Sequence, residues 1–190
     1  MIPLDGRPIL TAAAMRTAEN AKIAGGTSVD ALVERAGSAI AEAVARFAGA
    51  RDVLVLCGPG NNGADGYVAA TRLRTAGHSV RVAASHPART TAARRACATW
   101  SDEVGELHTV RPAAVLVDAL FGTGLARPLD TSAAASLRRL AEVAELSIAV
   151  DLPSGVATDD GTVLNEPPAF TMTLALGAAK PAHLLQPAAR

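Results

Sequence analysis

The chain has 190 residues, enough for one sizeable hydrophobic core and too few for two full-sized domains. It is 49% hydrophobic and 19% charged, a composition typical of a folded protein rather than a disordered one. Its 18 basic and 18 acidic residues cancel, so the overall charge gives no reason to expect a nucleic-acid partner. No apolar run approaches the roughly 18 residues that cross a bilayer. We therefore expect a cytoplasmic protein without membrane contact.

Two helices are predicted at the start of the chain. Thr11 is a suitable N-cap for a helix over 11–24, which a pair of glycines ends. Ser28 or Thr27 is a suitable N-cap for a longer helix that reaches residue 48. The apolar residues of this second helix recur at helical spacing: Leu32, Ala36, Ile40, Val44 and Phe47.

From residue 52 onward, strand-like and helix-like segments alternate. Five apolar runs are expected to form strands: 52–57, 79–84, 114–119, 146–150 and 170–176. Three helices are expected between them: 64–76, 88–101 and 131–144. Strands that are apolar on both faces and alternate with helices indicate a parallel sheet covered on both sides. We therefore predict one three-layer α/β domain over 1–190, with a mostly parallel central sheet and an N-terminal helical extension.

The first predicted strand ends in a glycine-rich turn. Gly58, Gly60 and Gly63 match the G-x-G-x-x-G dinucleotide fingerprint, and the free N–H groups of a following helix can receive a phosphate. That fingerprint also requires an acid about 20 residues further on, to hold a ribose. The sequence has no Asp or Glu between Asp65 and Asp102. The pattern therefore argues against an ordinary NAD-dependent oxidoreductase. A plain helix cap with turn glycines explains the glycines, but not the two asparagines and the aspartate that follow them.

Two further strands end in a carboxylate. Asp118 ends one apolar run before Gly122-Thr123-Gly124, and Asp151 ends another just before Ser154. Either aspartate alone could merely cap a turn, but a carboxylate at the end of a buried strand needs a cation or several donors. Because the carboxyl ends of parallel strands meet at one edge of a sheet, the three strand ends together favour a shared site over coincidence.

Three motifs, in this order, resemble the NAD(P)HX epimerase family, whose domain is of the YjeF N-terminal type: "GPGNNGADG", "VDALFGTGLARP" and "AVDLPSGV". "LTAAAM", "VERAG" and Lys180-Pro181 also look like that family, so the resemblance covers about residues 8–182. It implies a Rossmann-like three-layer α/β/α sandwich that spans the chain as a single domain, with no dehydratase domain. It also implies an isomerase of cofactor repair, which interconverts the R and S forms of hydrated NADH and NADPH (NADHX and NADPHX) at C6 of the nicotinamide ring. A separate or fused S-specific dehydratase then completes the repair.

The resemblance also implies the site residues. Asp151 is the expected catalytic residue, because a positioned carboxylate can both accept and donate a proton. One K⁺ per subunit is expected at Asn62, Asp118 and Ser154, whose neutral oxygens and single carboxylate suit a large monovalent cation better than Mg²⁺. The expected substrate-binding residues are Asn61, Asn62, Gly63, Ala64, Asp65, Gly122, Thr123, Gly124, Leu125, Ala126, Arg127, Pro128 and Asp151.

Several alternatives stay open at the level of sequence. Ala64 stands where the family usually has glycine, which adds a methyl group near the expected ligand and is costly if φ is positive there. The same fold could serve as a non-catalytic nucleotide-binding or dimerisation module. Epimerisation could proceed by ring opening and reclosure, or by loss and re-addition of water. The sequence does not set a preference between NADHX and NADPHX. The apolar surface of the first two helices suggests a homodimer.

Overall fold

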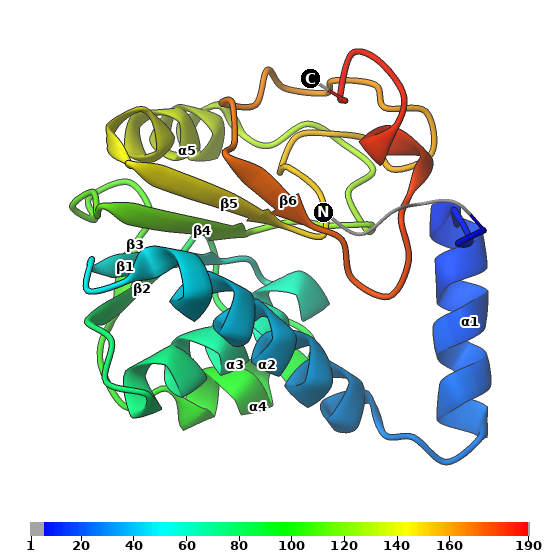
Figure 1. Cartoon of the computed structure of the whole chain (residues 1–190), viewed down its shortest axis with the longest axis horizontal. Coiled ribbons are helices and arrows are strands. Elements are labelled where there is room, and N and C mark those ends of the chain that lie inside the picture. Colours follow the sequence, from blue (N-terminus) through cyan, green and yellow to red (C-terminus); the bar gives the residue numbers. More distant parts are fainter. Residues whose placement is uncertain (1–5, 190) are drawn as a thin grey trace.

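The computed structural model describes residues 6–189. Within that range, six strands form one sheet in the order β3-β2-β1-β4-β5-β6, and every neighbouring pair is parallel (Figure 1). This is the strand order of the dinucleotide-binding Rossmann sheet, in which the order reverses between the first and the fourth strand. The strands are β1 (Val53–Cys57), β2 (Val80–Ala84), β3 (Val104–Glu106), β4 (Val115–Ala119), β5 (Leu146–Val150) and β6 (Met172–Leu174).

Helices cover both faces of the sheet, which confirms the predicted three-layer sandwich. α2, α3 and α4 lie on one face and α5 on the other, while α1 stands apart beside the edge where the strands end (Figure 1). α1 buries none of its residues, so it alone forms the predicted extension, and α2 belongs to the helical layer. The helices are α1 (Ala12–Ala24), α2 (Val29–Ala48), α3 (Asn61–Thr75), α4 (Thr91–Thr99), α5 (Thr131–Val143) and the short 3₁₀ helix η1 (Pro181–His183).

Local sequence signals set most helix starts. Thr11, Ser28, Thr90 and Asp130 each accept a hydrogen bond from a backbone N–H in the first turn of the helix that follows. In the strands, alternate residues enter two separate cores, one under the α2–α4 layer and one under α5. Asp118 of β4 lies at a position whose side chain points to the α5 face, so a carboxylate is buried at the end of a core strand.

The structure moves several predicted boundaries. β3 was not predicted, because three residues that include a glycine and a glutamate carry little strand signal. The run 170–176 forms a strand only over Met172–Leu174, and the helix predicted at 88–101 covers Thr91–Thr99. α3 begins at Asn61 rather than at 64, so the Asn61–Asp65 segment forms the start of a helix rather than a loop.

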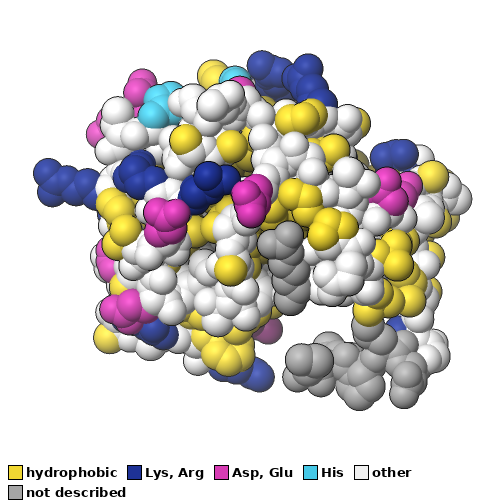
Figure 2. All heavy atoms as spheres, turned by 90° about the horizontal axis from the view of Figure 1, so that it is seen from above, with side chains coloured by type: hydrophobic (Ala, Val, Ile, Leu, Met, Phe, Trp, Pro, Cys, Tyr) yellow, Lys and Arg dark blue, Asp and Glu magenta, His cyan; other side chains and the backbone are white. Residues whose placement is uncertain are grey.

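Two observations concern the surface. No helix within residues 6–189 is both long and apolar enough to span a bilayer. On the face seen in Figure 2, basic and acidic side chains are interspersed among polar and apolar ones, and the basic ones do not gather into one broad patch.

Candidate functional site

The loops after β1 and β4 meet at the point where the strand order reverses. A Cβ atom at Gly58 would lie 1.7 Å from the carbonyl oxygen of Leu120, and a Cβ at Gly63 would lie 1.9 Å from the carbonyl oxygen of Gly58. Only glycine allows backbone to approach backbone this closely. The glycines therefore bring the first turn of α3 against the loop after β4, and ligands of open α/β sheets bind in the crevice at this point.

Asp151, directly after β5, occupies the centre of this edge. It is the only non-glycine residue within 6–189 that has a positive φ, at 68°. Its Oδ2 accepts hydrogen bonds from the backbone N–H of Thr123 (2.9 Å) and from the Thr123 hydroxyl (2.5 Å). Its Oδ1 accepts from the ammonium group of Lys180 and, at 3.4 Å, from the backbone N–H of Leu176. Both carboxylate oxygens are thus held in one orientation.

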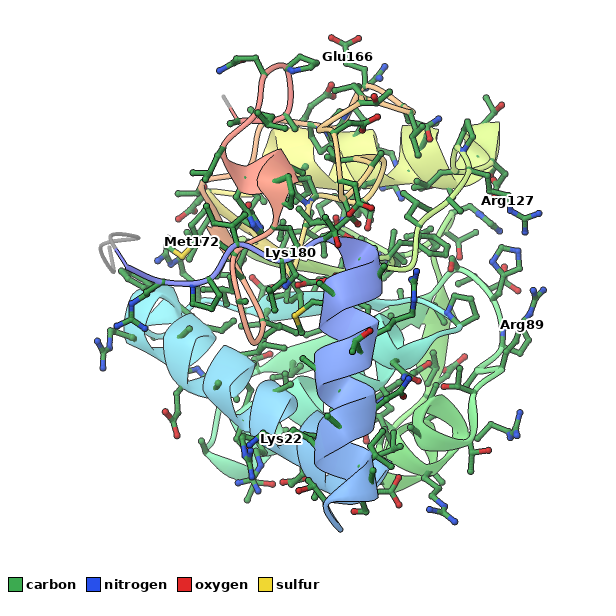
Figure 3. All side chains as sticks on the ribbon, turned by 90° about the vertical axis from the view of Figure 1, so that its right-hand side faces the viewer. Lys22, Arg89, Arg127, Glu166, Met172 and Lys180 are labelled. Carbon is green, nitrogen blue, oxygen red and sulfur yellow. The ribbon has the colours of Figure 1, made fainter. Side chains whose placement is uncertain are left out.

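Lys180 makes a buried ion pair with Asp151. Its side chain is 1% exposed, and its Nζ also donates to the carbonyl oxygen of Leu176 at 2.6 Å. Burial raises the pKa of Asp151, but the Lys180 charge and the hydrogen bonds from Lys180 and Thr123 outweigh it, so the pKa lies below the usual range. Asp151 is therefore ionised at neutral pH. Figure 3 shows Lys180 near the middle of the edge where the strands end.

His183 of η1 hydrogen-bonds to the backbone of both members of this ion pair. The carbonyl oxygen of Asp151 lies 2.7 Å from Nε2, and the backbone N–H of Lys180 donates to Nδ1 at 2.8 Å. Because a carbonyl can only accept, Nε2 carries a proton; because the backbone N–H of Lys180 can only donate, Nδ1 carries none, so the ring is neutral. Burial lowers the pKa of His183, which favours the same neutral form. The backbone N–H of Asp151 donates to Leu174, so the strained residue is fixed from both sides.

Asp118 and Ser154 form a second, more deeply buried polar centre. The Asp118 carboxylate is fully buried and accepts from the Ser154 N–H (2.9 Å), the Ser154 hydroxyl (2.8 Å) and the Leu120 N–H (3.1 Å). The Ser154 oxygen in turn accepts from the N–H of Phe121 at 3.0 Å. Burial raises the pKa of Asp118 to about 6, although these hydrogen bonds oppose the shift. No basic side chain within residues 6–189 pairs with this carboxylate.

Asn62 and Gly122 bring the loops after β1 and β4 up to Asp151. A Cβ atom at Gly122 would lie 2.6 Å from Oδ2 of Asp151 and 3.0 Å from Oδ1 of Asn62, so glycine is needed there. The Asn62 amide group donates to the carbonyl oxygen of Val150 at 3.4 Å. This leaves its Oδ1 without a donor among the described residues, beside the Asp151 carboxylate.

Asp65 is also buried at this edge, at 8% exposure. Among residues 6–189, none donates a hydrogen bond to its carboxyl group and none forms an ion pair with it. Burial raises the pKa of Asp65 well above the usual range, and the negative charges of Asp151 and of Glu19 on α1 raise it further. The surroundings of Asp65 therefore favour its uncharged form, whereas those of Asp151 favour the ionised form.

The side chain of Ala64 is directed into the core. Ala64 lies within α3, and it is not among the residues with a positive φ. Its methyl group is fully buried in the core under the α2–α4 layer. The positive φ that would make alanine costly at this position is therefore absent.

Other predicted site residues lie further from Asp151. Asn61 is exposed and lines a cavity of about 430 Å³ together with Thr90 and Arg95. The side chain of Arg127 extends from the outer rim of the edge, as does that of Arg89 (Figure 3). The rest of that loop is largely exposed: Gly124, Ala126 and Pro128, with Leu125 half-buried.

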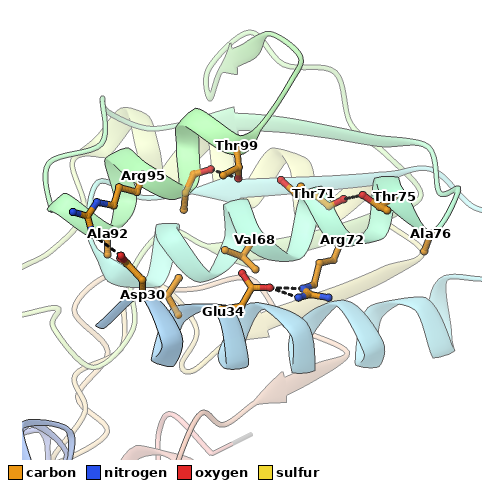
Figure 4. Close-up of a pocket in the computed structure, with 12 residues that line it drawn as sticks. Asp30, Glu34, Val68, Thr71, Arg72, Thr75, Ala76, Ala92, Arg95 and Thr99 are labelled. Atoms are coloured by element: carbon orange, nitrogen blue, oxygen red, sulfur yellow. Dashed lines mark hydrogen bonds and ion pairs between the residues drawn. The ribbon is translucent and has the colours of Figure 1, made fainter. Parts of the chain in front are cut away.

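Another cavity lies away from this edge. It has a volume of about 640 Å³ between α2, α3 and α4, and none of the predicted site residues lines it. Figure 4 shows its walls, where Glu34 pairs with Arg72 and Asp30 with Arg95. These ion pairs are exposed, and exposed pairs contribute little to stability. The cavity is a groove of the helical layer and not part of the polar edge.

A family model described as "YjeF-related protein N-terminus" matches residues 29–182. The chain belongs to this family. A protein of Bordetella pertussis (strain CS) named NAD(P)H-hydrate epimerase is 42% identical over 144 residues, which cover 73% of this chain and 63% of that protein. The chain thus spans less than two thirds of that relative. A protein of the same name from Achromobacter xylosoxidans (strain A8) is 39% identical over 167 residues, covering 84% of this chain and 79% of the relative.

Two further comparisons bear on organisation and fold. A "Bifunctional NAD(P)H-hydrate repair enzyme Nnr" of Pyrobaculum aerophilum is 37% identical over 174 residues, which are 84% of this chain but only 34% of that protein. The crystal structure of the yeast protein ynu0 superposes with a TM-score of 0.81 at 23% identity, covering 92% of this chain and 82% of that chain. The latter match establishes the shared YjeF-type fold.

Sequence reasoning missed the partners of Asp151. Lys180 contributed to the family resemblance but was given no role, and His183 was not considered. The sequence did contain one signal that Lys180 is buried. Lys180 is one of only two lysines in the chain, and it follows an apolar segment just after the predicted last strand. A lysine in such a place is buried only when it is paired.

Proposed function

We propose that this chain interconverts the R and S forms of NADHX and NADPHX at C6 of the nicotinamide ring, as a step in cofactor repair. The observation that carries the proposal is Asp151, an ionised carboxylate that follows β5 and is held against the loop after β4, next to the strand-order reversal. The names of the Bordetella and Achromobacter relatives give the substrate class.

The loops around Asp151 suit a dinucleotide. Free N–H groups at the first turn of α3 attract phosphate, and Gly58 and Gly63 let this turn and the neighbouring loops pack closely around it. We assign pyrophosphate binding to the segments 58–65 and 122–128. The hydrated nicotinamide ring would then lie over Asp151, whose carboxylate accepts the proton of the C6 hydroxyl. Thr123 and Lys180 keep that carboxylate ionised and aimed.

A coupled assay tests the activity. We expect the purified chain, added to a mixture of both NADHX epimers with an S-specific dehydratase, to allow complete consumption of the mixture. Without the chain, consumption should stop when the S form is exhausted. Slow consumption of the R form at the enzyme-free rate would instead support a non-catalytic binding or dimerisation module of the same fold.

We further propose that one K⁺ binds at Asn62, Asp118 and Ser154. The residues fit a monovalent cation, because Asp118 is a fully buried carboxylate with no basic partner and Asn62 has an amide oxygen without a donor. A cation there would neutralise the buried charge and hold the loops after β1, β4 and β5 together.

Potassium should therefore stabilise the fold. We expect the melting temperature at pH 7.5 to be several degrees higher in about 100 mM KCl than in the same concentration of N-methyl-D-glucamine chloride. In Asp118→Asn the difference should disappear, because the substitution removes the charge that the cation balances. An equal response to K⁺ in wild type and variant would contradict this site. Asp130→Asn, which keeps a helix cap outside the site, serves as the matched control.

Three wider expectations accompany the proposed activity. An S-specific dehydratase, separate or fused as the name of the Pyrobaculum relative suggests, would consume the product. The chain would act in the cytoplasm, where reduced nicotinamide cofactors turn over. Exposed apolar side chains of the first two helices and their connection, Ile23, Val29 and Phe47, would support a homodimer, which light scattering after size-exclusion chromatography tests.

A further inference from the structure

Two carboxyl groups of this edge have opposite surroundings. Asp151 accepts hydrogen bonds from Thr123, Lys180 and Leu176 and is paired with an ammonium group. Asp65 is almost as deeply buried and has no donor and no cation among the described residues. For buried groups, the first arrangement favours a charged carboxylate and the second favours a neutral carboxylic acid. Pairs of groups whose environments differ in this way divide acid and base roles between them.

We propose that Asp65 is the proton donor of the epimerisation and Asp151 its proton acceptor, and that the reaction proceeds by opening and reclosure of the nicotinamide ring. This inference rests on the proposed activity and deepens it. Asp65 is the fifth residue of α3 and Asp151 directly follows β5, so the two carboxyl groups come from different elements. They are close enough for the charge of Asp151 to act on Asp65.

The proposed step balances in protons and electrons. Asp151 takes the proton of the C6 hydroxyl, and the C6–O bond becomes an aldehyde carbonyl. The N1–C6 bond breaks, its electron pair goes to N1, and N1 takes the proton of Asp65. Rotation about the C5–C6 bond then presents the other face of the aldehyde to N1. Reclosure returns the N1 proton to Asp65 and the Asp151 proton to the new C6 hydroxyl.

The asymmetry of the two carboxyl groups favours this route over loss and re-addition of water. Ring opening and reclosure leave Asp65 protonated and Asp151 ionised after each turnover. If Asp65 protonated a departing hydroxide and Asp151 deprotonated the returning water, each turnover would end with the protons exchanged. That state places a charge on the unpartnered Asp65 and a proton on the carboxylate that Lys180 holds ionised. The charged groups that act on Asp65 are Glu19 and Asp151. Both are acidic, so both oppose a negative charge on Asp65.

Asp65→Asn tests the proton donor. The amide is neutral and of the same shape, so the variant should fold with an unchanged or higher melting temperature. We expect kcat for conversion of purified R-NADHX, followed by chromatographic separation of the epimers, to fall at least about 100-fold, while KM changes less than about threefold. Asp65→Glu should recover part of the lost kcat. Asp102→Asn, at an exposed ion pair with Arg74, is the matched control and should keep wild-type kcat.

Three results would overturn the assignment of Asp65. An Asp65→Asn enzyme with wild-type kcat shows that no proton comes from Asp65, and one with a raised KM alone shows a binding role. A markedly lower melting temperature shows that the carboxyl has structural partners. These outcomes differ from failure of the proposed activity, in which the wild-type chain itself does not interconvert the epimers.

Oxygen labelling tests the route. In water enriched in ¹⁸O, a single turnover of wild-type enzyme by ring opening leaves the original ¹⁶O on C6 of the newly formed S epimer. Loss and re-addition of water places one ¹⁸O there for every molecule converted. Mass spectrometry of the S epimer, corrected with an enzyme-free sample, separates the two. Incorporation that keeps pace with conversion overturns the ring-opening route.

Discussion

Asp151→Asn is expected to lower kcat for epimerisation by about 10³-fold while substrate affinity changes little. The substitution removes the group that accepts the C6 hydroxyl proton, and general base catalysis contributes about 10²–10⁴-fold. Asparagine is the informative replacement because the backbone at 151 has φ of 68°, a conformation that Asn and Asp adopt more readily than other non-glycine residues. Alanine or glutamate would add backbone strain to the chemical change.

The measurement is kcat and KM for R-NADHX, together with the dissociation constant of an unreactive dinucleotide. Asp159→Asn is the matched control: it is the same chemical change in a nearby loop, at a carboxylate that accepts from the Ala12 N–H at the start of α1. It should retain wild-type kcat. If Asp151→Asn equilibrates the epimers at the wild-type rate, Asp151 is not the base. The three-layer fold would still stand in that case, because it does not depend on this carboxyl.

The strand ends were predictable from sequence because each combines an apolar run with residues that cannot continue it. Asp118 and Asp151 each follow a buried β-type run, and a parallel sheet brings such ends to one edge. The cap residues Thr11 and Ser28 likewise carry a local signal that their helices use. These features depend on near neighbours in the chain, so sequence patterns reveal them.

The electrostatic roles at the edge were not predictable in this way. Lys180 and Asp151 are separated by 29 residues, and nothing local to either indicates that they pair. Asp65 belongs to a motif that sequence assigns to binding, but its lack of partners follows from how α3 lies against α1 and the sheet. The expectation that Asp151 both donates and accepts protons was made without knowledge of the Lys180 ion pair, which keeps Asp151 ionised and so favours the role of proton acceptor.

Helix geometry explains why Ala64 and Asp65, which are neighbours in one motif, have different surroundings. Ala64 looked like an intrusion because its motif normally has glycine there, yet helix geometry turns its side chain into the core while Asp65, one residue further on, lies at the edge. In a helix successive side chains point about 100° apart, so neighbours in a motif can have unrelated roles. A prediction that treats 61–65 as a loop cannot distinguish the buried Ala64 from Asp65 at the edge.

Lys180→Met is expected to destabilise the fold and to change how activity depends on pH. Methionine fills a similar volume but leaves the Asp151 carboxylate buried without its cation. Breaking a buried ion pair from one side costs about 3–5 kcal/mol, which corresponds to a fall of about 10 °C in melting temperature for a chain of this size. Calorimetry at pH 7 measures the loss.

The pH dependence should reverse in sign. In the wild type, the lowered pKa of Asp151 contributes stability above its unfolded pKa, and that stability is lost as pH falls through the folded pKa. Without Lys180, burial dominates and raises the pKa of Asp151 above its ordinary value. The melting temperature of the variant should then rise as pH falls from 7 to about 5, where the carboxyl becomes neutral, and its kcat should fall over the same range because the base is lost.

Lys22→Met provides the control, since Lys22 is the only other lysine of the chain and lies exposed in the last turn of α1. Its melting temperature and pH profile should match those of the wild type. A purely structural role for Lys180 predicts a lower melting temperature at every pH with an unshifted kcat profile, and that result would remove it from the mechanism. A shift of the low-pH side of the kcat profile, by contrast, shows that Lys180 sets the pKa of Asp151, because a change in packing alone does not move a pKa.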